Sequence, residues 1–182
     1  DQDMNRLLND FQPKVIVNCA GIVKQNPNIK DPIDTILINS VFPHKLNKIC
    51  KFRKIKLIHI STDCVFSGEK GLYDELDFAD SDDLYGRSKF LGEVLTEDAL
   101  TLRTSYIGEE LITQRGLLSW FLSQKGTVNG FSKAIYSGLT TLEIARVIEN
   151  FVIPNLKLKG LYHLSSDPID KFSLLNIINS VY

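Results

Sequence analysis

The chain has 182 residues, of which 43% are hydrophobic and 24% charged, with a net charge of −1. This is the composition of an ordinary globular domain, which buries roughly 70% of the surface of its unfolded chain. A charge so near zero creates no field that attracts nucleic acid or anionic lipid, so neither is expected as a partner. No apolar run approaches the ~18 residues needed to span a bilayer, and no signal peptide opens the chain, so a cytoplasmic protein is expected.

The first half of the chain alternates between helical and strand patterns. In chain order, a short helix is predicted around 7–11, followed by a strand at 15–17 that ends in a tight turn at 18–21. A helical stretch over 31–51 and a strand at 57–60 come next. Pro43 interrupts the helical stretch, so a break or a new start of the helix is expected near Asn39 and Ser40.

A polar segment over 64–83 separates the two halves and is longer than a plain connection, so a functional loop or lid is expected there. Beyond it, the patterns predict a helix from Leu84 to about Leu95, a strand at 100–104 and a helix near 117–123. A helix with a capping box is predicted after Thr140, then a strand at 161–164 and a last helix from about Phe172. Strands that alternate with helices indicate βαβ units, and therefore an α/β fold with a Rossmann-like, doubly wound parallel sheet.

No metal site is predicted. The three cysteines have no C-x-x-C spacing and neighbour apolar elements, so they are interpreted as reduced core or loop residues: Cys19, Cys50 and Cys64. The acidic residues between 74 and 83 lack the spacing of a calcium loop, and solubility or lid behaviour explains them better.

Tyr85 and Lys89 carry the clearest chemical signal. Four residues apart on a helix, a phenol and an ammonium lie side by side on one face. A free tyrosine has a pKa near 10, and lowering it toward 7 requires roughly 4 kcal/mol of selective stabilisation of the phenolate. A cation one helical turn away can supply part of this stabilisation. Such a phenol can protonate a carbonyl oxygen while a hydride arrives.

The Y-x-x-x-K spacing alone is weak, since an amphipathic helix with surface tyrosine and lysine side chains has the same pattern. Two further turns strengthen it. Ser61, Thr62 and Asp63 end one predicted strand, and Asn18-Cys19-Ala20-Gly21 ends the one before it. Both turns lie at the carboxyl ends of strands, where open parallel sheets bind their ligands. The hydroxyl of Thr62 can then share the substrate oxygen with the phenol.

These motifs resemble the extended short-chain dehydrogenase/reductase family, and most closely its dTDP-4-dehydrorhamnose reductase branch. The matching segments are 15–21, 60–66, 84–93, 103–105 and 160–165. The resemblance implies reduction, by NADPH or NADH, of a keto group on a nucleotide-linked deoxysugar, in the synthesis of cell-surface polysaccharide. A homodimer is left open.

The resemblance also implies roles for individual residues. Tyr85 would donate the proton, Lys89 would bind the nicotinamide ribose and tune the phenol, and Thr62 would complete the catalytic triad. The further residues expected at the cofactor are Cys19, Ala20, Gly21, Asn39 and Ser61, beside Tyr85 and Lys89 themselves. Those expected at the substrate are Thr62, Asp63 and Tyr106.

Two departures from the family pattern bear on function. A related dehydratase branch has Thr-Asp-Glu where this chain has Thr62-Asp63-Cys64, so dehydration is disfavoured. The reductase branch commonly has a tyrosine at the position of Cys64, which leaves the sugar undetermined. An epimerase with the same triad and a non-catalytic subunit on the same fold remain alternatives.

The glycine-rich turn that receives the pyrophosphate in this family is not in the sequence, since no G-x-G-x-x-G occurs. We therefore expect a fragment of a longer chain, with a partial dinucleotide-binding core at 1–104. At 105–182 we expect substrate-binding elements interleaved with the last strands and helices. Weak cofactor binding by the 182 residues alone is expected.

Overall fold

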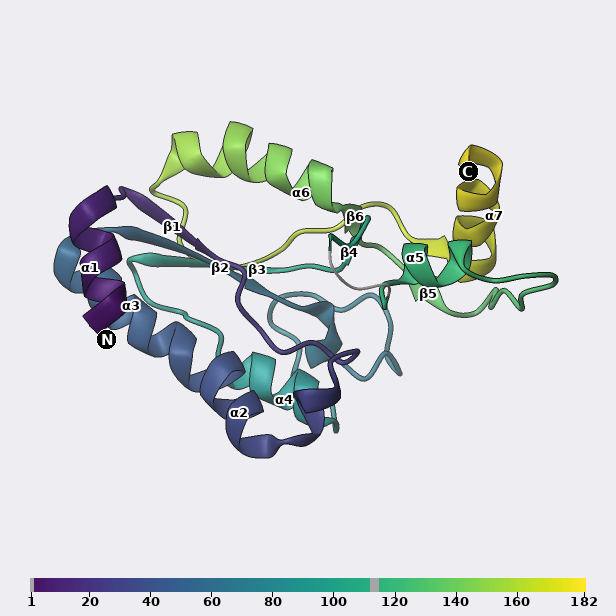
Figure 1. The fold of residues 1–182 in the computed structure, drawn as a ribbon, viewed down its shortest axis with the longest axis horizontal. Helices are drawn as coiled ribbons and strands as arrows, with labels where there is room; N and C mark the ends of the chain where they lie inside the picture. Colours follow the sequence, from purple (N-terminus) through teal and green to yellow (C-terminus); the bar gives the residue numbers. More distant parts are fainter. Residues whose placement is uncertain (1, 112–114) are drawn as a thin grey trace. The chain divides into compact units, whose positions relative to one another are not determined.

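The computed structural model describes residues 2–111 and 115–182 (Figure 1). It divides into two units, each described separately below. Unit 1 consists of Asp1–Arg103 and Val152–His163, and unit 2 of Thr104–Phe151 and Leu164–Tyr182. The sequence predicts one boundary, after residue 104. The chain also returns to unit 1 after residue 151, because a late strand joins the sheet of that unit. The roles expected for the two parts stay predictions.

The sheet of unit 1 has four parallel strands in the order β1-β2-β3-β7. The strands are β1 (Val15–Asn18), β2 (Lys56–Ser61), β3 (Ala99–Arg103) and β7 (Gly160–His163). In the register, Asn18 lies opposite His59, and Ser61 lies opposite Arg103, which in turn pairs with His163. The predicted α/β class with a parallel sheet is confirmed, and the carboxyl ends of the strands lie at one edge of the sheet.

The helices of unit 1 are α1 (Gln2–Phe11), α2 (Pro32–Ile36), α3 (Phe42–Arg53) and α4 (Leu84–Leu91). Figure 1 shows α2, α3 and α4 on the same side of the sheet. Short 3-10 turns occur at Pro27–Lys30, Asp63–Val65 (η3) and Ile153–Asn155. The main core joins α1, α3 and the sheet through buried apolar side chains: Leu8, Leu46, Cys50, Ile55, Leu57, Val94 and Ala99.

The helical stretch before β2 has the expected irregularity at Asn39 and Ser40. Between α2 and α3, residues Leu37–Val41 form a π-helical segment, η2, through which the backbone stays helical. Pro43 has no N–H to donate to the carbonyl of Asn39, four residues earlier, so the regular ladder cannot continue there. The interruption is therefore a change of helical pitch rather than a new start.

The helix that carries the Tyr85–Lys89 pair is shorter than predicted and ends at Leu91 instead of near Leu95. Gly92 follows it, and a Cβ at this position would lie 1.9 Å from the carbonyl oxygen of Asn39. The chain turns away at the point where the two backbones meet. A helical pattern in the sequence could not reveal this tertiary contact.

Among its described residues, 104–111, 115–151 and 164–182, unit 2 contains two small sheets and three α-helices. β4 (Tyr106–Ile107) pairs in parallel with β6 (Leu139–Thr140), and β5 (Ile135–Tyr136) pairs antiparallel with β8 (Ile169–Asp170). The helices are α5 (Leu117–Leu122), α6 (Thr141–Val147), continued by a π-helical segment at Ile148–Val152, and α7 (Lys171–Val181). Leu118, Leu175 and Ile178 form the core. The predicted cap is present, since Thr140 accepts a hydrogen bond from the N–H of Glu143 at 3.1 Å.

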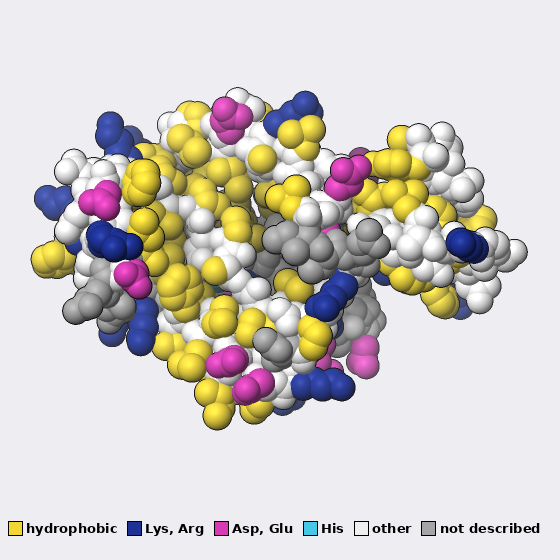
Figure 2. All heavy atoms as spheres, in the orientation of Figure 1, with side chains coloured by type: hydrophobic (Ala, Val, Ile, Leu, Met, Phe, Trp, Pro, Cys, Tyr) yellow, Lys and Arg dark blue, Asp and Glu magenta, His cyan; other side chains and the backbone are white. Residues whose placement is uncertain are grey.

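Hydrophobic side chains gather on the surface around α1 and α3 (Figure 2). They line a groove of about 370 Å³ between α1, η2 and α3: Met4, Leu37, Ile38, Val41, Phe42, Leu46 and Ile49, with the stem of Lys45. Within the described part of the chain, no helix combines the length and the apolar character that crossing a membrane requires.

Candidate active site

The predicted catalytic residues lie in unit 1, beyond the carboxyl ends of β1 and β2. The loop after β1 carries the exposed residues Cys19, Ala20 and Gly21, and Thr62 directly follows β2. Tyr85 and Lys89 lie on α4, which packs against η2 and η3. The two predicted turns, Ser-Thr-Asp and Asn-Cys-Ala-Gly, therefore lie at the same edge of one sheet. The helix that carries Tyr85 and Lys89 lies at this edge too.

A cap and a glycine hold the first turn of α4 in place. Asp83 accepts a hydrogen bond from the backbone N–H of Gly86 at 2.7 Å, which caps the helix. A Cβ at Gly86 would lie 2.2 Å from the hydroxyl oxygen of Ser81 and 2.3 Å from the carbonyl oxygen of Cys64. Only glycine allows this approach, so the start of α4, where Tyr85 lies, is fixed against the turn after β2.

Lys89 is almost fully buried, with 5% of its surface exposed. Its Nζ donates a hydrogen bond to the carbonyl oxygen of Ile60, near the end of β2, at 2.8 Å. Burial lowers the pKa of Lys89 to about 8, against the opposing effect of the Glu93 carboxylate. An ammonium has three N–H donors, so the one directed at Ile60 leaves two that can serve a ligand.

The loop after β1 passes close to this ammonium. A Cβ at Gly21 would lie 3.8 Å from Nζ of Lys89 and 3.3 Å from Oδ1 of Asn39. Partial burial of the Cys19 thiol raises its pKa, and the charge of Lys89 has a smaller, opposite effect. An exposed glycine backbone beside a buried ammonium fits the ribose and nicotinamide end of a dinucleotide. The residues present at this edge are therefore compatible with the expected cofactor.

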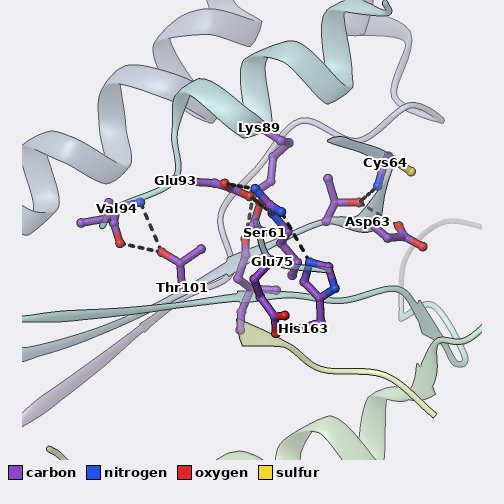
Figure 3. Close-up of polar contacts among 12 residues, drawn as sticks. Ser61, Asp63, Cys64, Glu75, Lys89, Glu93, Val94, Thr101 and His163 are labelled. Atoms are coloured by element: carbon purple, nitrogen blue, oxygen red, sulfur yellow. Dashed lines mark hydrogen bonds and ion pairs between the residues drawn. The ribbon is translucent and has the colours of Figure 1, made fainter. Parts of the chain in front are cut away.

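Thr62 has 6% of its surface exposed and caps the η3 turn. Its hydroxyl oxygen accepts from the N–H of Cys64 at 3.1 Å, and the hydroxyl group donates to Oδ1 of Asp63 at 3.3 Å. Figure 3 shows Asp63 and Cys64 together at this turn. The hydroxyl would have to exchange its bond with Asp63 for one with a substrate oxygen in order to act as predicted.

Ser61 and Asn39, which were expected at the cofactor, use their polar groups within the protein. Ser61 donates to Oε1 of Glu93 at 2.8 Å. The amide of Asn39, which is 0% exposed, accepts from the N–H of Ile22 at 2.8 Å and donates to the Ile22 carbonyl at 3.0 Å and the Ser88 hydroxyl at 3.1 Å. Both residues thus support the loop and the helix of the site, and a direct cofactor contact stays a prediction.

Tyr106, the aromatic residue expected at the substrate, is not part of unit 1. It lies on β4 of unit 2 with 58% of its surface exposed. Its role at the substrate stays a prediction.

A buried ion pair behind Ser61 was not predicted. Nε and Nη2 of Arg103 donate to the two carboxylate oxygens of Glu93, each at 2.8 Å, and Nη1 faces Nε2 of His163 at 3.4 Å (Figure 3). The one sequence signal for it is the spacing of Glu93, four residues after Lys89, which places the two side chains on the same face of a helix. Its partners come from strands whose neighbours in the sheet cannot be read from one sequence.

The long polar loop after η3 is anchored to the same network. The ring of Phe66 stacks on Tyr73 at 4.2 Å and lies 5.0 Å from the guanidinium of Arg103. Glu75 accepts a hydrogen bond from the backbone N–H of His163 at 2.7 Å. The loop is thereby tied to the carboxyl ends of β3 and β7. Over residues 2–111 and 115–182, no three His, Cys, Asp or Glu side chains are grouped to hold a metal ion.

The fold and this edge of the sheet define the class of protein: a Rossmann-like α/β unit with a Tyr-x-x-x-Lys helix at the carboxyl ends of its parallel strands. The chain belongs to the RmlD substrate binding domain family, whose model matches residues 1–174. The resemblance that the sequence motifs indicated is thus confirmed at the level of the family.

Named relatives match parts of the chain. The probable low-salt glycan biosynthesis reductase Agl14 of Haloferax volcanii is 36% identical over 106 residues, 56% of this chain and 35% of that protein. The dTDP-4-dehydrorhamnose reductase of Aggregatibacter actinomycetemcomitans is 26% identical over 178 residues, 89% of this chain and 58% of that protein. Methionine adenosyltransferase 2 subunit beta of Rattus norvegicus is 34% identical over 90 residues, 50% of this chain and 27% of that protein. The chain therefore spans less than two thirds of the length of each of these relatives.

Two solved structures have the same fold. A hypothetical dTDP-4-dehydrorhamnose reductase from Sulfolobus tokodaii superposes with a TM-score of 0.84 at 27% identity, covering 98% of this chain and 65% of that one. The dTDP-4-dehydrorhamnose reductase of Bacillus anthracis, solved in complex with NADP, gives a TM-score of 0.83 at 22% identity, covering 99% of this chain and 66% of that one.

Proposed function

We propose that this protein takes part in the reduction, by NADPH or NADH, of a 4-keto group on a nucleotide-linked deoxysugar, as a dTDP-4-dehydrorhamnose reductase does. The product would enter cell-surface polysaccharide synthesis, and a cytoplasmic location is part of the proposal. Membership of the RmlD substrate binding domain family supports it, as do relatives named as reductases of this kind. The choice between NADPH and NADH stays open.

The observation that carries the proposal is the position of the Tyr85–Lys89 pair. The ammonium of Lys89 is buried and bonded to the carbonyl of Ile60, beside the glycine loop after β1. Tyr85 lies one helical turn away, at the helix start that is packed on the Thr62 turn. A cation held in this way favours the phenolate form of a neighbouring tyrosine.

In the proposed reaction, Tyr85 donates its proton to the carbonyl oxygen of the sugar. The bound nicotinamide supplies the hydride. Thr62 hydrogen-bonds the same oxygen, and Lys89 stabilises the phenolate that remains and holds the ribose of the cofactor. Cys64 takes the position at which a dehydratase would have a glutamate, so no second carboxyl group is present there to remove water.

The test is an absorbance assay of NADPH and NADH oxidation with dTDP-4-dehydrorhamnose and other 4-keto sugar nucleotides. It should be made with the 182-residue chain and with any longer natural polypeptide that contains it. Tyr85→Phe should reduce turnover at least 100-fold, since general acid catalysis contributes about 10²–10⁴-fold. Tyr162→Phe, on β7, is the matched control and should keep wild-type activity. Retention of more than a few per cent of activity by Tyr85→Phe would refute the catalytic role of this residue.

Two other functions use the same fold. A nucleotide-sugar epimerase would hold NAD through purification and would interconvert sugars without net oxidation of NADPH. A non-catalytic subunit is favoured by the match to methionine adenosyltransferase 2 subunit beta over half of the chain. The presence of both Tyr85 and Lys89 favours an enzyme over such a subunit. Absence of turnover with every sugar nucleotide, together with co-purification of a partner enzyme, would favour the subunit.

The homodimer considered from the sequence stays a prediction. The apolar groove between α1, η2 and α3 offers a surface for self-association. Light scattering after size-exclusion chromatography would measure the mass directly.

A further inference from the structure

A second lysine lies at the phenol of Tyr85, and no sequence motif points to it. Lys24, on the loop after β1, has its Nζ 5.9 Å from the centroid of the Tyr85 ring. The same Nζ lies 2.5 Å from Oδ2 of Asp83, and both side chains are partly exposed, at 46% and 40%. Lys24 thus bridges the candidate proton donor and the residue that begins its helix.

The two oxygens of Asp83 have separate partners. Oδ1 accepts from the N–H of Gly86 and caps α4, while Oδ2 pairs with Lys24. Backbone N–H groups at this helix start, those of Gly86 and Tyr85, help to lower the pKa of Asp83 against the effect of its partial burial. The anion is therefore held against the backbone of the first turn, whereas the cation lies over the aromatic ring.

We propose that Lys24 and Asp83 act as a charge pair that sets how readily Tyr85 releases its proton, with Lys24 favouring the phenolate and Asp83 moderating it. The inference rests on the proposed role of Tyr85 as proton donor and adds a residue from another element to that role. Lys24 acts here as a positioning and tuning residue, since it lies over the Tyr85 ring and pairs with Asp83.

The other titratable or charged groups near Tyr85 come from several elements. Arg87 and Lys89 lie on α4 itself, and Nε of Arg87 donates to the carbonyl oxygen of Ser81 at 3.2 Å. Asp63 and Cys64 belong to η3 and act on the charge of Lys24. η2 carries no titratable side chain, and the remaining elements in contact with α4 contribute the exposed Asp34 of α2 and Lys30 of the turn at Pro27–Lys30. Of these cations, Lys24 is the one that lies over the Tyr85 ring at a distance the structure defines.

The size of the effect follows from Coulomb's law. A unit charge about 6 Å away in a partly hydrated environment changes a pKa by on the order of 0.5–1 unit. Because both side chains are partly exposed, added salt should reduce the change.

The experiment measures the titration of Tyr85 directly, without substrate or cofactor. The near-ultraviolet phenolate absorbance of each protein is followed against pH, and the curve of the same protein with Tyr85→Phe is subtracted. The set comprises wild type, Lys24→Met, Lys24→Arg and Asp83→Asn, with Lys30→Met as the matched control. Asparagine caps helices about as well as aspartate, so Asp83→Asn keeps α4 intact while it removes the charge.

Lys24→Met should raise the pKa of Tyr85 by about 0.5–1 unit, and Asp83→Asn should lower it by a similar amount. Lys24→Arg and Lys30→Met should leave it unchanged, and both shifts should shrink in about 1 M salt. If the pair had only a structural role, Lys24→Met and Asp83→Asn would shift the pKa of Tyr85 in the same direction, and that result would overturn the inference. An unchanged pKa of Tyr85 in Lys24→Met would also overturn it. Failure of the reductase assay would refute the proposed function and leave this titration result as it stands.

Discussion

Arg103 at the end of β3 and Glu93 in the segment after α4 form a bidentate ion pair, with side chains only 4% and 2% exposed. Ser61 donates to the same carboxylate from the end of β2, and His163 faces the guanidinium from β7. The pair therefore joins three adjacent strands at the edge formed by their carboxyl ends. It lies behind Thr62, the next residue after Ser61 in the chain.

Loss of either charge of this pair should strongly destabilise unit 1, because an unpaired charge would remain buried. We expect Glu93→Gln and Arg103→Met each to lower the free energy of unfolding by about 3–5 kcal/mol. The double variant Glu93→Gln with Arg103→Met should lose less stability than the sum of the losses in the two single variants. Urea denaturation measures all three, and Glu97→Gln, which removes an exposed pair with Lys159, should change stability by no more than about 1 kcal/mol. Additive losses in the double variant would contradict the coupling.

The contact of Gly92 with the backbone of Asn39 should not tolerate a side chain. A Cβ there would lie 1.9 Å from the carbonyl oxygen and 2.9 Å from the carbonyl carbon of Asn39. Gly92→Ala should therefore cost about 3 kcal/mol or more in thermal or urea unfolding. At Gly116 the nearest atom, in the Glu110 side chain, would be 3.4 Å away, so Gly116→Ala should cost about 1 kcal/mol at most. Equal effects of the two substitutions would show that α4 can move away from η2.

Lys89 should make stability depend on pH in the alkaline range. Burial lowers its pKa from 10.5 to about 8, so between these values the unfolded chain binds a proton that the folded protein does not. Stability contributed by this group therefore rises with pH across that window, by roughly 3 kcal/mol in total.

Lys89→Met should remove this rise, and the exposed Lys45→Met should leave it in place. The measurement is urea denaturation of the three proteins between about pH 7 and pH 10.5. A wild-type profile parallel to that of Lys89→Met throughout would rule out the lowered pKa.

His59 should make the protein sensitive to acid. Its ring is fully buried, and Nδ1 faces the amide of Asn18 at 3.0 Å, whose own oxygen accepts the N–H of Ala20. This arrangement assigns the proton to Nε2, which has no hydrogen-bond partner among the described residues. Burial, aided by the charge of Lys89, lowers the pKa of His59 to about 3.

Between pH 6.5 and about 3 the unfolded chain thus binds a proton that the folded protein excludes, and stability falls as pH falls. The expected slope is about 1.4 kcal/mol per pH unit. His59→Asn keeps a polar group and should flatten the profile by this amount, while the exposed His44→Gln should not. An acid profile of His59→Asn equal to that of the wild type would contradict the assignment.

Much of unit 1 could be predicted because its signals are local. The apolar runs of β1 and β2, the helix of Tyr85 and Lys89, and Pro43 as the cause of an irregular helix each leave a mark within a few residues. The position of the catalytic candidates followed from one rule, since Thr62 and Gly21 both follow parallel strands. The strands described in unit 2, β4, β5, β6 and β8, have two residues each, which is too short to leave a periodic pattern.

What could not be predicted depends on contacts between distant segments. Arg103 meets Glu93 and His163 only because β3 lies between β2 and β7. The end of α4 is set by the backbone of Asn39, and the place of Lys24 over Tyr85 is set by the path of the loop after β1. Asn39 is one residue whose contacts could not be predicted. The sequence places it in the right region, but only the structure reveals that its amide is bonded to Ile22 and Ser88.

The order of the strands also has a consequence for how the protein assembles. β3 ends at Arg103, yet its neighbour β7 begins only at Gly160, after most of unit 2 has been made. During synthesis, one side of β3 therefore stays unpaired until β7 has left the ribosome. Such distant pairing closes a long loop and gives a high contact order, so folding is expected to be slow and limited by this late docking step. Cutting the chain after residue 103 would then yield an incomplete sheet rather than an independent domain.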